Sequence, residues 1–378
     1  MQLAYRPATD FEPAAVAAPF GPASTPVTGN PFLERWAVDA ALRNLARPGE
    51  RFHLLSAGPG DHQPVLPLTR IYESPFGLGS IWSVWDHIHC LDTTPGEADD
   101  FGPLLAALFD FLRAHRVRML RWTSLPADTA FYGLLLDWLA ESGLEVHVTK
   151  SVERPVLLAD ACPTRVGPDT ILDGKRLREL RRTRRRLEER GRVEFKVVDG
   201  PHDARHWIPH FLDIEASGWK GEAGTALACR RNERAFFEQM TCHAAAEGNV
   251  LVYSLELDGA PVAMSVNYRA GGKVWCFKTA FRGELARYSP GALLEYESTL
   301  AALADPTLAW LDACTTDASG LMGELWRDRR PVVDLMISTR RSSNRLVRGT
   351  AIGWRGWLAL KRWTRERSAK TGAKRGKR

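Results

Sequence analysis

The sequence predicts an α/β fold in which mixed, mostly antiparallel sheets are flanked by helices. The first observation is a run of three strands with alternating apolar residues, at 249–257, 260–268 and 273–281. The second is the helix that begins directly after these strands, at Pro290, with apolar residues every third or fourth position. The third is an alternation of strand-like and helix-like segments over the first 160 residues. Together they favour two α/β domains in tandem.

The first domain is expected at residues 30–162, after a leader at 1–29 that is rich in Ala, Pro, Thr and Gly and is expected to be mobile. Its predicted helices lie at 32–45, 101–114 and 129–142. Its predicted strands lie at 52–57, 65–72, 80–88, 119–123 and 145–158. This order suggests a degenerate twin of the second domain. We expect it to form one wall of a cleft and to set substrate choice.

The second domain is expected at residues 163–339, after a linker at 162–169. Helices are predicted at 175–192, 203–218, 232–247 and 321–329, and a Gly-rich loop at 221–224. Beyond the three central strands, further strands are predicted at 192–198, 308–314 and 332–338. The two hairpin turns are assigned to Asp258-Gly259 and to Ala270-Gly271-Gly272, because these residues tolerate positive φ. Residues 340–378 form a basic, Trp-containing tail.

Charge is distributed unevenly along the chain. The 378 residues carry 51 Lys and Arg against 45 Asp and Glu, but 14 of the basic residues and one acid lie in the tail. The remaining 37 basic and 44 acidic residues leave the body of the chain acidic. Arginines are also dense in the predicted helix 175–192. There they favour a solvated helix that bridges the domains, with contact to nucleic acid, to an acidic partner or to coenzyme phosphates as alternatives.

Composition limits the class of protein. No apolar run approaches the ~20 residues of a membrane-spanning helix, and no signal peptide is recognised at the N-terminus. Six scattered cysteines predict a reduced, cytoplasmic protein. The tail combines Trp with Lys and Arg, which suits an anionic membrane surface and would also suit RNA, while a solvated, disordered tail is the plainer interpretation. Peripheral association at the inner membrane face is therefore a hypothesis.

The start of the helix at Pro290 has the features of a phosphate-binding loop. A helix N-terminus offers unpaired backbone N–H groups and the positive end of the helix dipole. Pro290 suits the first turn, and Gly291 would let a ligand approach the backbone closely. An ordinary strand–loop–helix connection is the alternative. Glu295 and Glu297 argue against a strongly anionic ligand pocket.

Four segments resemble the GNAT N-acyltransferases: FLDIEASGWKG at 211–221, FKTA at 277–280, YSPG at 288–291 and LWRDRR at 325–330. The resemblance spans about 169–339 and is closest to CelD-type, cellulose-biosynthesis-associated acetyltransferases, a FemAB-like branch with two GNAT-like domains. The GNAT phosphate signature is not matched, because Arg287 and Gly291 are one residue too far apart.

This resemblance implies acyl transfer from acetyl-CoA or another acyl-CoA to an amine acceptor, in sugar, polysaccharide or cell-envelope precursor metabolism. It implies coenzyme contacts from Phe277, Thr279 and the loop Tyr288, Ser289, Pro290, Gly291, Ala292 and Leu293. Trp219 and Lys220 would shape the acceptor pocket. Trp326 and Arg329 would contact the coenzyme or an anionic substrate.

Acyl transfer to an amine needs a proton acceptor, donors for the oxyanion and a proton for the leaving thiolate. Glu215, near the end of its predicted helix, is the leading candidate for the general base, and Asp312 at a strand end is the second. Lys278 on a central strand is expected to contact the oxyanion or a phosphate, because a lysine is costly to bury without a purpose. Tyr288 could protonate the thiolate.

Two other chemistries are less favoured. His87 and His89 could share one face of a strand, but no third ligand lies near them, so we predict no metal site. Cys276 and Cys314 have no nearby histidine, which disfavours an acyl-cysteine route. Two alternative functions remain from the sequence. One is a FemAB-like transfer from aminoacyl-tRNA. The other is a non-catalytic adaptor for RNA or membrane on the same fold. A small-molecule or glycan-precursor amine is preferred to nucleic acid as the partner.

Overall fold

The fold is taken from a computed structural model of the chain. It describes residues 5–7, 29–56, 65–73, 79–96, 101–158, 172, 174–198, 204–315, 320–354 and 356–357. The linker predicted at 162–169 and most of the predicted leader lie outside the described residues, as does the tail beyond Trp357.

The first half of the chain contains three helices and six strands within the described residues. In chain order they are β1 (Tyr5–Pro7), α1 (Arg35–Leu45), β2 (Arg51–Ser56), β3 (Val65–Glu73), β4 (Ser80–Val84), α2 (Gly102–Ala114), β5 (Val117–Pro126), α3 (Ala130–Glu141) and β6 (Val146–Leu158).

The second half begins with the arginine-rich helix and repeats the same alternation. Its main elements are α5 (Gly174–Glu188), β7 (Val193–Val198), α6 (Ala204–Ala216), α7 (Trp219–Glu222), α8 (Arg231–Ala246), β8 (Val250–Leu257), β9 (Ala260–Ala270), β10 (Lys273–Phe281), α9 (Pro290–Ala304), β11 (Trp310–Asp312), α10 (Leu321–Leu325) and β12 (Asp328–Ser338). Short 3-10 helices lie at Leu227–Cys229, Gly283–Tyr288 and Arg341–Ser343, and residues 344–354 are helical.

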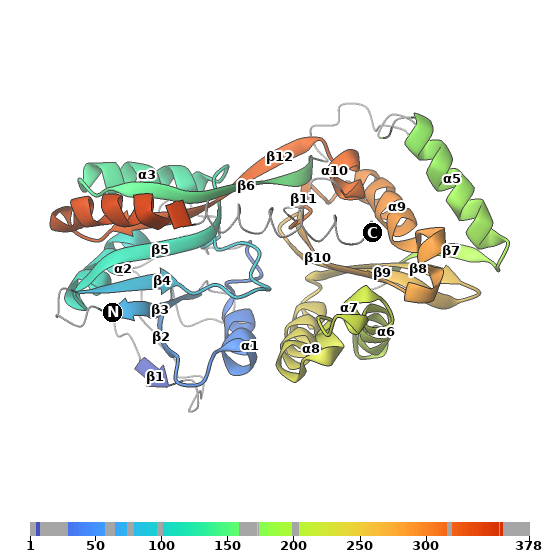
Figure 1. The fold of residues 1–378 in the computed structure, drawn as a ribbon, viewed down its shortest axis with the longest axis horizontal. Helices are drawn as coiled ribbons and strands as arrows, with labels where there is room; N and C mark the ends of the chain where they lie inside the picture. Colours follow the sequence, from blue (N-terminus) through green and yellow to red (C-terminus); the bar gives the residue numbers. More distant parts are fainter. Residues whose placement is uncertain are drawn as a thin grey trace, which may run out of the picture.

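All twelve described strands belong to one sheet, in the order β1-β2-β3-β4-β5-β12-β6-β11-β10-β9-β8-β7 (Figure 1). Counted inward from either edge of the sheet, the first three strand pairs are antiparallel and the fourth is parallel. The pairs from there to the centre are antiparallel. The two halves are therefore two copies of one topology that meet at the β12–β6 pair. This confirms the α/β class and the predicted twin relation of the halves.

The halves also exchange strands. β12, the last strand of the chain, lies between β5 and β6 of the first half. In turn, β6 pairs with β11 of the second half. The boundary at residue 162 remains a prediction, because the pairing of strands continues across it.

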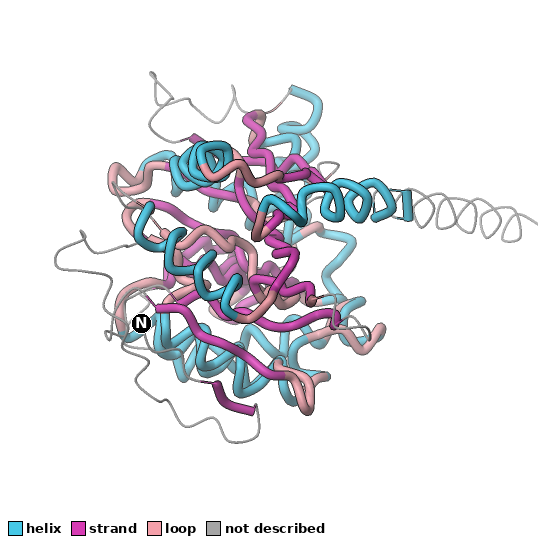
Figure 2. Tube along the Cα trace, turned by 90° about the vertical axis from the view of Figure 1, so that its left-hand side faces the viewer, coloured by secondary structure: helices cyan, strands magenta, loops and turns pink. Residues whose placement is uncertain are grey.

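Helices cover both faces of the sheet (Figures 1 and 2). In the second half, α6 and α8 lie on one face of β8–β10, where Phe211 and Phe237 share a core with Ala280. On the opposite face, α9 packs with α5 and α10 around a second core that contains Phe281. α1 of the first half packs directly against α8 of the second, so the two copies are also joined through their helices.

Most predicted elements are confirmed, and the differences have local causes. Asp258, Gly259, Gly271 and Gly272 all have positive φ, as the two predicted hairpin turns require. The strand predicted at 80–88 ends at Val84, and residues 85–96, here called the crossing segment, form no helix or strand. This segment reaches the second half, where His89 contacts Glu233 and Trp275 donates to Asp92. The helix predicted at 321–329 ends at Leu325, because β12 begins at Asp328, earlier than predicted.

The arginine-rich helix α5 packs against the second half instead of bridging the halves. Its side chains Leu177, Leu180 and Leu187 enter the core beside α9. Near the chain end, Val347 and Ala351 pack against Met119 and Met336, so the first part of the predicted tail belongs to the folded body. Among the described helices, none has the length and apolar character to cross a membrane.

Candidate active site

The parallel strands β10 and β11 separate in the middle of the second half. They pair only from Lys273 to Trp275 and from Trp310 to Asp312, after which β11 ends and β10 continues for six residues. The backbone groups of β10 that face β11 therefore lose their strand partner beyond Trp275. A cavity of about 280 Å³ occupies this opening, lined by Lys220, Cys276, Phe277, Lys278, Thr279, Glu295, Ala313, Cys314, Thr315, Gly320, Leu321 and Met322.

A β-bulge in β10 shapes this cavity. The pairing of β10 with β9 skips Phe277, between Cys276 and Lys278. A bulge of this kind turns two consecutive side chains to the same face. Accordingly, Phe277 packs beside Phe237 and His89 on the α8 side, while Cys276 packs in the core on the α9 side. The expectation that Lys278 alternates regularly with Cys276 is wrong, because the bulge places Lys278 on the opposite face.

Lys278 therefore faces α6 and α8. Its ammonium lies 5.7 Å from the centre of the Phe277 ring. Burial lowers the pKa of Lys278, the cations Lys220 and Arg230 lower it further, and the acids Glu215 and Glu233 oppose this shift. Lys278 lines the cavity as the sequence predicted, and its lowered pKa makes it easier to deprotonate.

Glu295 was missed as a site residue. It projects from the second turn of α9 into the cavity, on the face opposite Lys278. Burial raises the pKa of Glu295 from 4.5 to about 7, against a lowering influence from Arg176. Its position four residues after Gly291 was a usable signal, but the sequence argument treated it only as a charge opposing an anion. A carboxyl group with this pKa can donate or accept a proton near neutral pH.

Glu215 is almost fully buried at the end of α6 and does not line the cavity. One carboxylate oxygen accepts a hydrogen bond from the backbone N–H of Leu227 at 2.8 Å. The other accepts from Lys220 Nζ at 3.2 Å, and Lys220 also donates to the carbonyl of Thr279 at 3.2 Å. With both oxygens engaged, Glu215 holds Lys220 across to β10. This geometry favours a positioning residue over the predicted general base.

The predicted coenzyme loop lies where β10 leads into α9. Ser289 adopts a left-handed conformation, with φ of 47°, and Pro290 begins the helix. Gly291 and Leu293 are buried, and a Cβ atom on Gly291 would lie 2.9 Å from the Phe281 ring. Glycine at 291 is therefore required by packing inside the protein, whereas the sequence argument related it to close approach of a ligand.

Tyr288 is not brought to the cavity. Its ring is buried in the core beside α9, with the guanidinium groups of Arg287 and Arg186 at 4.8 and 5.6 Å. Its hydroxyl accepts a hydrogen bond from Arg287 at 2.8 Å. These contacts place two cations near the start of α9 and disfavour Tyr288 as the acid that protonates a thiolate in the cavity.

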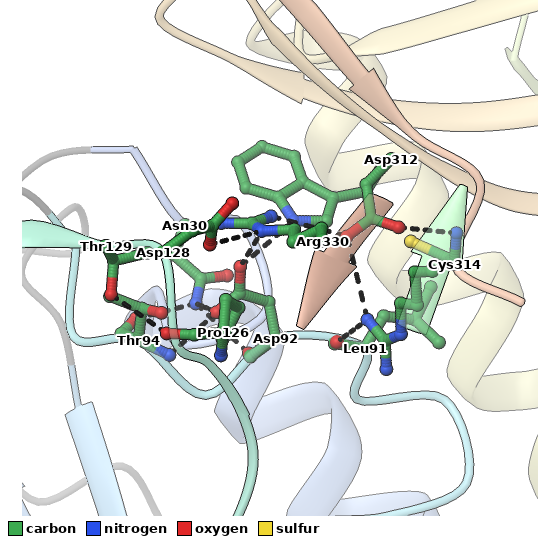
Figure 3. Close-up of polar contacts among 12 residues, drawn as sticks. Asn30, Leu91, Asp92, Thr94, Pro126, Asp128, Thr129, Asp312, Cys314 and Arg330 are labelled. Carbon is green, nitrogen blue, oxygen red and sulfur yellow. Dashed lines mark hydrogen bonds and ion pairs between the residues drawn. The ribbon is translucent and has the colours of Figure 1, made fainter. Parts of the chain in front are cut away.

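Asp312 is fully buried in an ion-pair network at the seam between the halves (Figure 3). One oxygen lies 3.3 Å from Arg330 and 3.7 Å from Arg154, and the other accepts from the backbone N–H of Cys314 at 2.7 Å. Burial lowers the pKa of Arg330, but Asp92, Asp312 and Asp128 outweigh this and raise it. A carboxylate so paired is poorly suited to accept a substrate proton. Asp312 instead fixes the end of β11.

Two of the predicted substrate residues, Trp326 and Arg329, do not line the cavity. Trp326 is buried and donates from its indole N–H to Thr299 at 3.1 Å, so it belongs to the core. Arg329 donates to the carbonyls of Gly323 and Trp326 and closes the end of α10. Neither lines the cavity. Trp219 is 64% exposed on α7 beside Lys220, where it is free to contact a ligand.

The two histidines of the crossing segment reach the second half. His89 Nε2 lies 3.1 Å from Glu233 on α8, and the other oxygen of Glu233 accepts from Arg230 at 2.7 Å. Burial, with smaller influences from Lys278 and Arg230, lowers the pKa of His89 to about 3. The neutral ring therefore donates to Glu233. Within the described residues there is no group of three side chains suited to bind a metal ion.

The two cysteines of the cavity are protonated. Burial raises the pKa of Cys276, as do Asp312 and Glu295. Burial and Asp312 likewise raise the pKa of Cys314. Neither thiol is therefore activated as a nucleophile.

Residues 174–319 match the family model described as an acetyltransferase (GNAT) domain. This range covers α5 to the residues just after β11 and includes most of the cavity lining. No curated protein matches the sequence. The match lies within the second half and covers less than half of the chain.

Several solved structures are similar in fold. They include the C-terminal DUF2156 domain of an Agrobacterium fabrum protein named as a lysylphosphatidylglycerol synthetase, with 12% identity and a TM-score of 0.49 over 84% of this chain and 91% of that one. FemX matches with 10% identity and a TM-score of 0.49, over 81% and 90% of the two chains. A tandem GNAT protein from the clavulanic acid pathway matches with 14% identity and a TM-score of 0.37, over 80% and 87%. At these scores the likenesses support no functional argument.

Proposed function

We propose that this chain, whose residues 174–319 match the model of a GNAT acetyltransferase domain, transfers an acyl group from acyl-CoA to an amine. The observation that carries this proposal is the cavity between the separated strands β10 and β11. It connects the α9 face of the sheet with the α6 and α8 face, so a thioester and an amine could meet in it from opposite sides.

The donor would approach from the α9 side. The helix N-terminus at Pro290 supplies backbone N–H groups and a partial positive charge for the coenzyme phosphates. Arg287 and Arg186 lie over the Tyr288 ring beside it and would add charge-assisted contacts. The acyl chain would then extend along β10 towards Cys276 and Thr279.

The proton transfers would use the two shifted groups of the cavity. Lys278 lies on the acceptor face, and its lowered pKa makes its neutral form easier to reach. In that form it takes a proton as the amine nitrogen attacks the thioester carbonyl. The carbon–sulfur bond then breaks, and protonated Glu295 on the donor face gives its proton to the leaving thiolate. The products are an amide and free coenzyme A, and solvent restores both side chains.

The backbone of β10 would stabilise the oxyanion. The Thr279 carbonyl faces away from β9, since it accepts from Lys220, and the N–H of the same residue leaves the strand on the same edge. This N–H group is held in place by the sheet, and β11 does not pair with it. A fixed donor of this kind stabilises charge that develops in the transition state.

The test is a calorimetric titration of acetyl-CoA into the protein and into Met322→Trp. Met322 lines the cavity from α10, so the indole should fill the acyl channel and weaken binding at least ~10-fold, a change of about 1.4 kcal/mol. Met322→Leu, which keeps a similar volume, is the matched control and should bind as the parent does. A parent protein that binds neither acetyl-CoA nor longer acyl-CoAs would exclude the proposal.

A second candidate function rests on α5. Arg178, Arg182 and Arg185 are exposed on this helix, and arginines along an exposed face suit the phosphates of RNA. Transfer from an aminoacyl-tRNA would then replace acyl-CoA. Binding of tRNA that weakens steeply with salt, together with absent acetyl-CoA binding, would favour this function. An adaptor without activity would bind RNA or anionic lipid and acylate nothing.

The cellular role also remains a proposal. An acceptor from polysaccharide or cell-envelope precursor metabolism, a cytoplasmic location and membrane association through residues 340–378 derive from the sequence resemblance and from tail composition. They can be tested once the amine acceptor is identified.

A further inference from the structure

The first half of the chain has its own opening, at the position that corresponds to the acyl cavity. The parallel pair β4–β5 ends at Ser83 and Arg121, as β10–β11 ends at Trp275 and Asp312. A cavity of about 930 Å³, here called the groove, lies at this end. It is lined from the first half by β3, β4, β5 and the crossing segment, and from the second half by Arg230 and Glu233 of α8.

Arginines dominate the part of the groove that lies on the sheet. Arg121 and Arg154 each have a buried Nε atom without a hydrogen-bond partner among the described residues. Arg154 is almost fully buried, and its nearest acid, Asp312, lies 3.7 Å away. Arg121 is 3.9 Å from Asp334, and its guanidinium stacks over the Trp354 ring at 5.8 Å. Buried donors of this kind need an acceptor, and a ligand with an acidic group would supply it.

The opposite wall of the groove leads to the acyl cavity. Glu233 lies there with Arg230 and, through His89, joins the crossing segment to α8. Arg230, Glu233 and His89 are also charge neighbours of Lys278, which lines the acyl cavity. Arg230 and Glu233 line the groove, so this cluster connects the groove electrostatically with Lys278 of the acyl cavity. Glu50 and Asp86 add two further carboxylates to the lining, so the groove offers acids as well as arginines.

We propose that the groove binds the acceptor, and that this acceptor is an amine which also carries an acidic group. Arg121 and Arg154 would hold the acid, and the ammonium would extend past Glu233 towards Lys278. The proposal rests on the proposed acyl transfer and specifies its substrate class. It also gives the first half of the chain the recognition of the acceptor, while the second half binds the donor.

The experiment measures thiol release from acetyl-CoA with pairs of amines that differ by an acidic group: L-tryptophan and tryptamine, L-lysine and cadaverine, and glucosamine 6-phosphate and glucosamine. The acid member of at least one pair should be used with at least ~10-fold higher kcat/KM than its partner. Arg121→Gln should raise the KM for that member about 10-fold and leave the KM for acetyl-CoA unchanged. Arg121→Lys should restore part of the loss.

Arg43→Gln, an exposed change in the last turn of α1, is the control and should alter neither KM. Thermal melting of each variant separates a binding defect from a folding defect. Preference for the amines without acid, or an Arg121→Gln variant with unchanged KM for the acceptor, would overturn the groove assignment. Acetyl-CoA binding with no acylation of any pair would also count against it and leave the donor site intact. Absence of acetyl-CoA binding would instead remove the proposed function itself.

Discussion

Two side chains of the cavity, Lys278 and Glu295, lie on opposite faces of β10 because of one extra residue. The bulge at Phe277 turns Lys278 towards α6 and α8, while Glu295 reaches the cavity from α9. Burial shifts both pKa values towards neutrality, in opposite directions. Amine acylation needs a group that accepts a proton and a group that donates one, and these two shifts favour Lys278 and Glu295 in those roles.

Glu295→Gln should remove an ionisation near pH 7 from the pH profile of kcat, as measured by thiol release. It should also change stability with a defined sign. The pKa of Glu295 is raised in the folded state, so its contribution is fully present below about pH 4.5 and is lost as pH rises through 7. The variant should therefore be more stable than the parent at pH 8.5, by about 1–2 kcal/mol after allowance for partial exposure.

Chemical denaturation at pH 5 and at pH 8.5 tests the stability claim, because the difference between the two proteins should nearly vanish at the lower pH. An equal difference at both values would mean that the carboxyl is not buried in the way described. Glu297→Gln, on the same helix, is the control at both pH values. Glu297 pairs with Arg184, so its loss should not stabilise the protein at high pH.

Sequence reasoning selected Lys278, which lines the cavity, and two carboxylates, Glu215 and Asp312, which do not. Glu215 and Asp312 were selected because they lie at the ends of predicted elements. That position does not indicate which residues they contact in the folded protein. Asp312 forms an ion pair with Arg154 from the first half of the chain, and no local sequence pattern encodes such a contact. Glu295 was discounted because the sequence argument counted it as a negative charge. In the fold, burial raises the pKa of Glu295 and so favours its neutral form.

At the scale of elements, the start of α9 depends on the contact between Gly291 and Phe281. Because a Cβ atom at 291 would lie 2.9 Å from the ring, Gly291→Ala should destabilise the protein by about 1–3 kcal/mol, as measured by urea unfolding. A double variant with Phe281→Leu should recover part of this loss, because leucine removes the obstructing ring atoms. Additive losses in the double variant would show that the ring is not the obstacle.

The strands and helices of the central region could be predicted from the sequence, because the alternation of apolar residues and the turn residues are local signals. Two features of this region could not be predicted. The bulge at Phe277 has no signal in the local sequence, and the rings that Phe277 contacts, Phe237 of α8 and Tyr268 of β9, come from other elements. The start of β12 at Asp328 was assigned to a helix, because its pairing partners lie more than 150 residues earlier in the chain, on β6.

At the scale of the molecule, the exchange of β12 and β6 joins the two copies. If residues 1–163 and 164–378 are expressed as separate chains, each should be unstable alone, because each lacks a strand that its sheet needs. Coexpression should yield a complex that co-purifies and melts in one transition. Either fragment behaving as a stable monomer, with dispersed amide signals in solution, would contradict this dependence.

The position of β12 also has a consequence for synthesis of the protein. β12 is the last strand of the chain, yet it lies between β5 and β6, at the centre of the sheet. While the ribosome is still producing residues 159–327, a nascent first half would carry two unpaired strand edges. Those edges can pair with other chains until β12 emerges and pairs with β5 and β6. Overexpression of this protein should therefore depend on slow translation or on chaperones that shield β5 and β6 until residue 338 has left the exit tunnel.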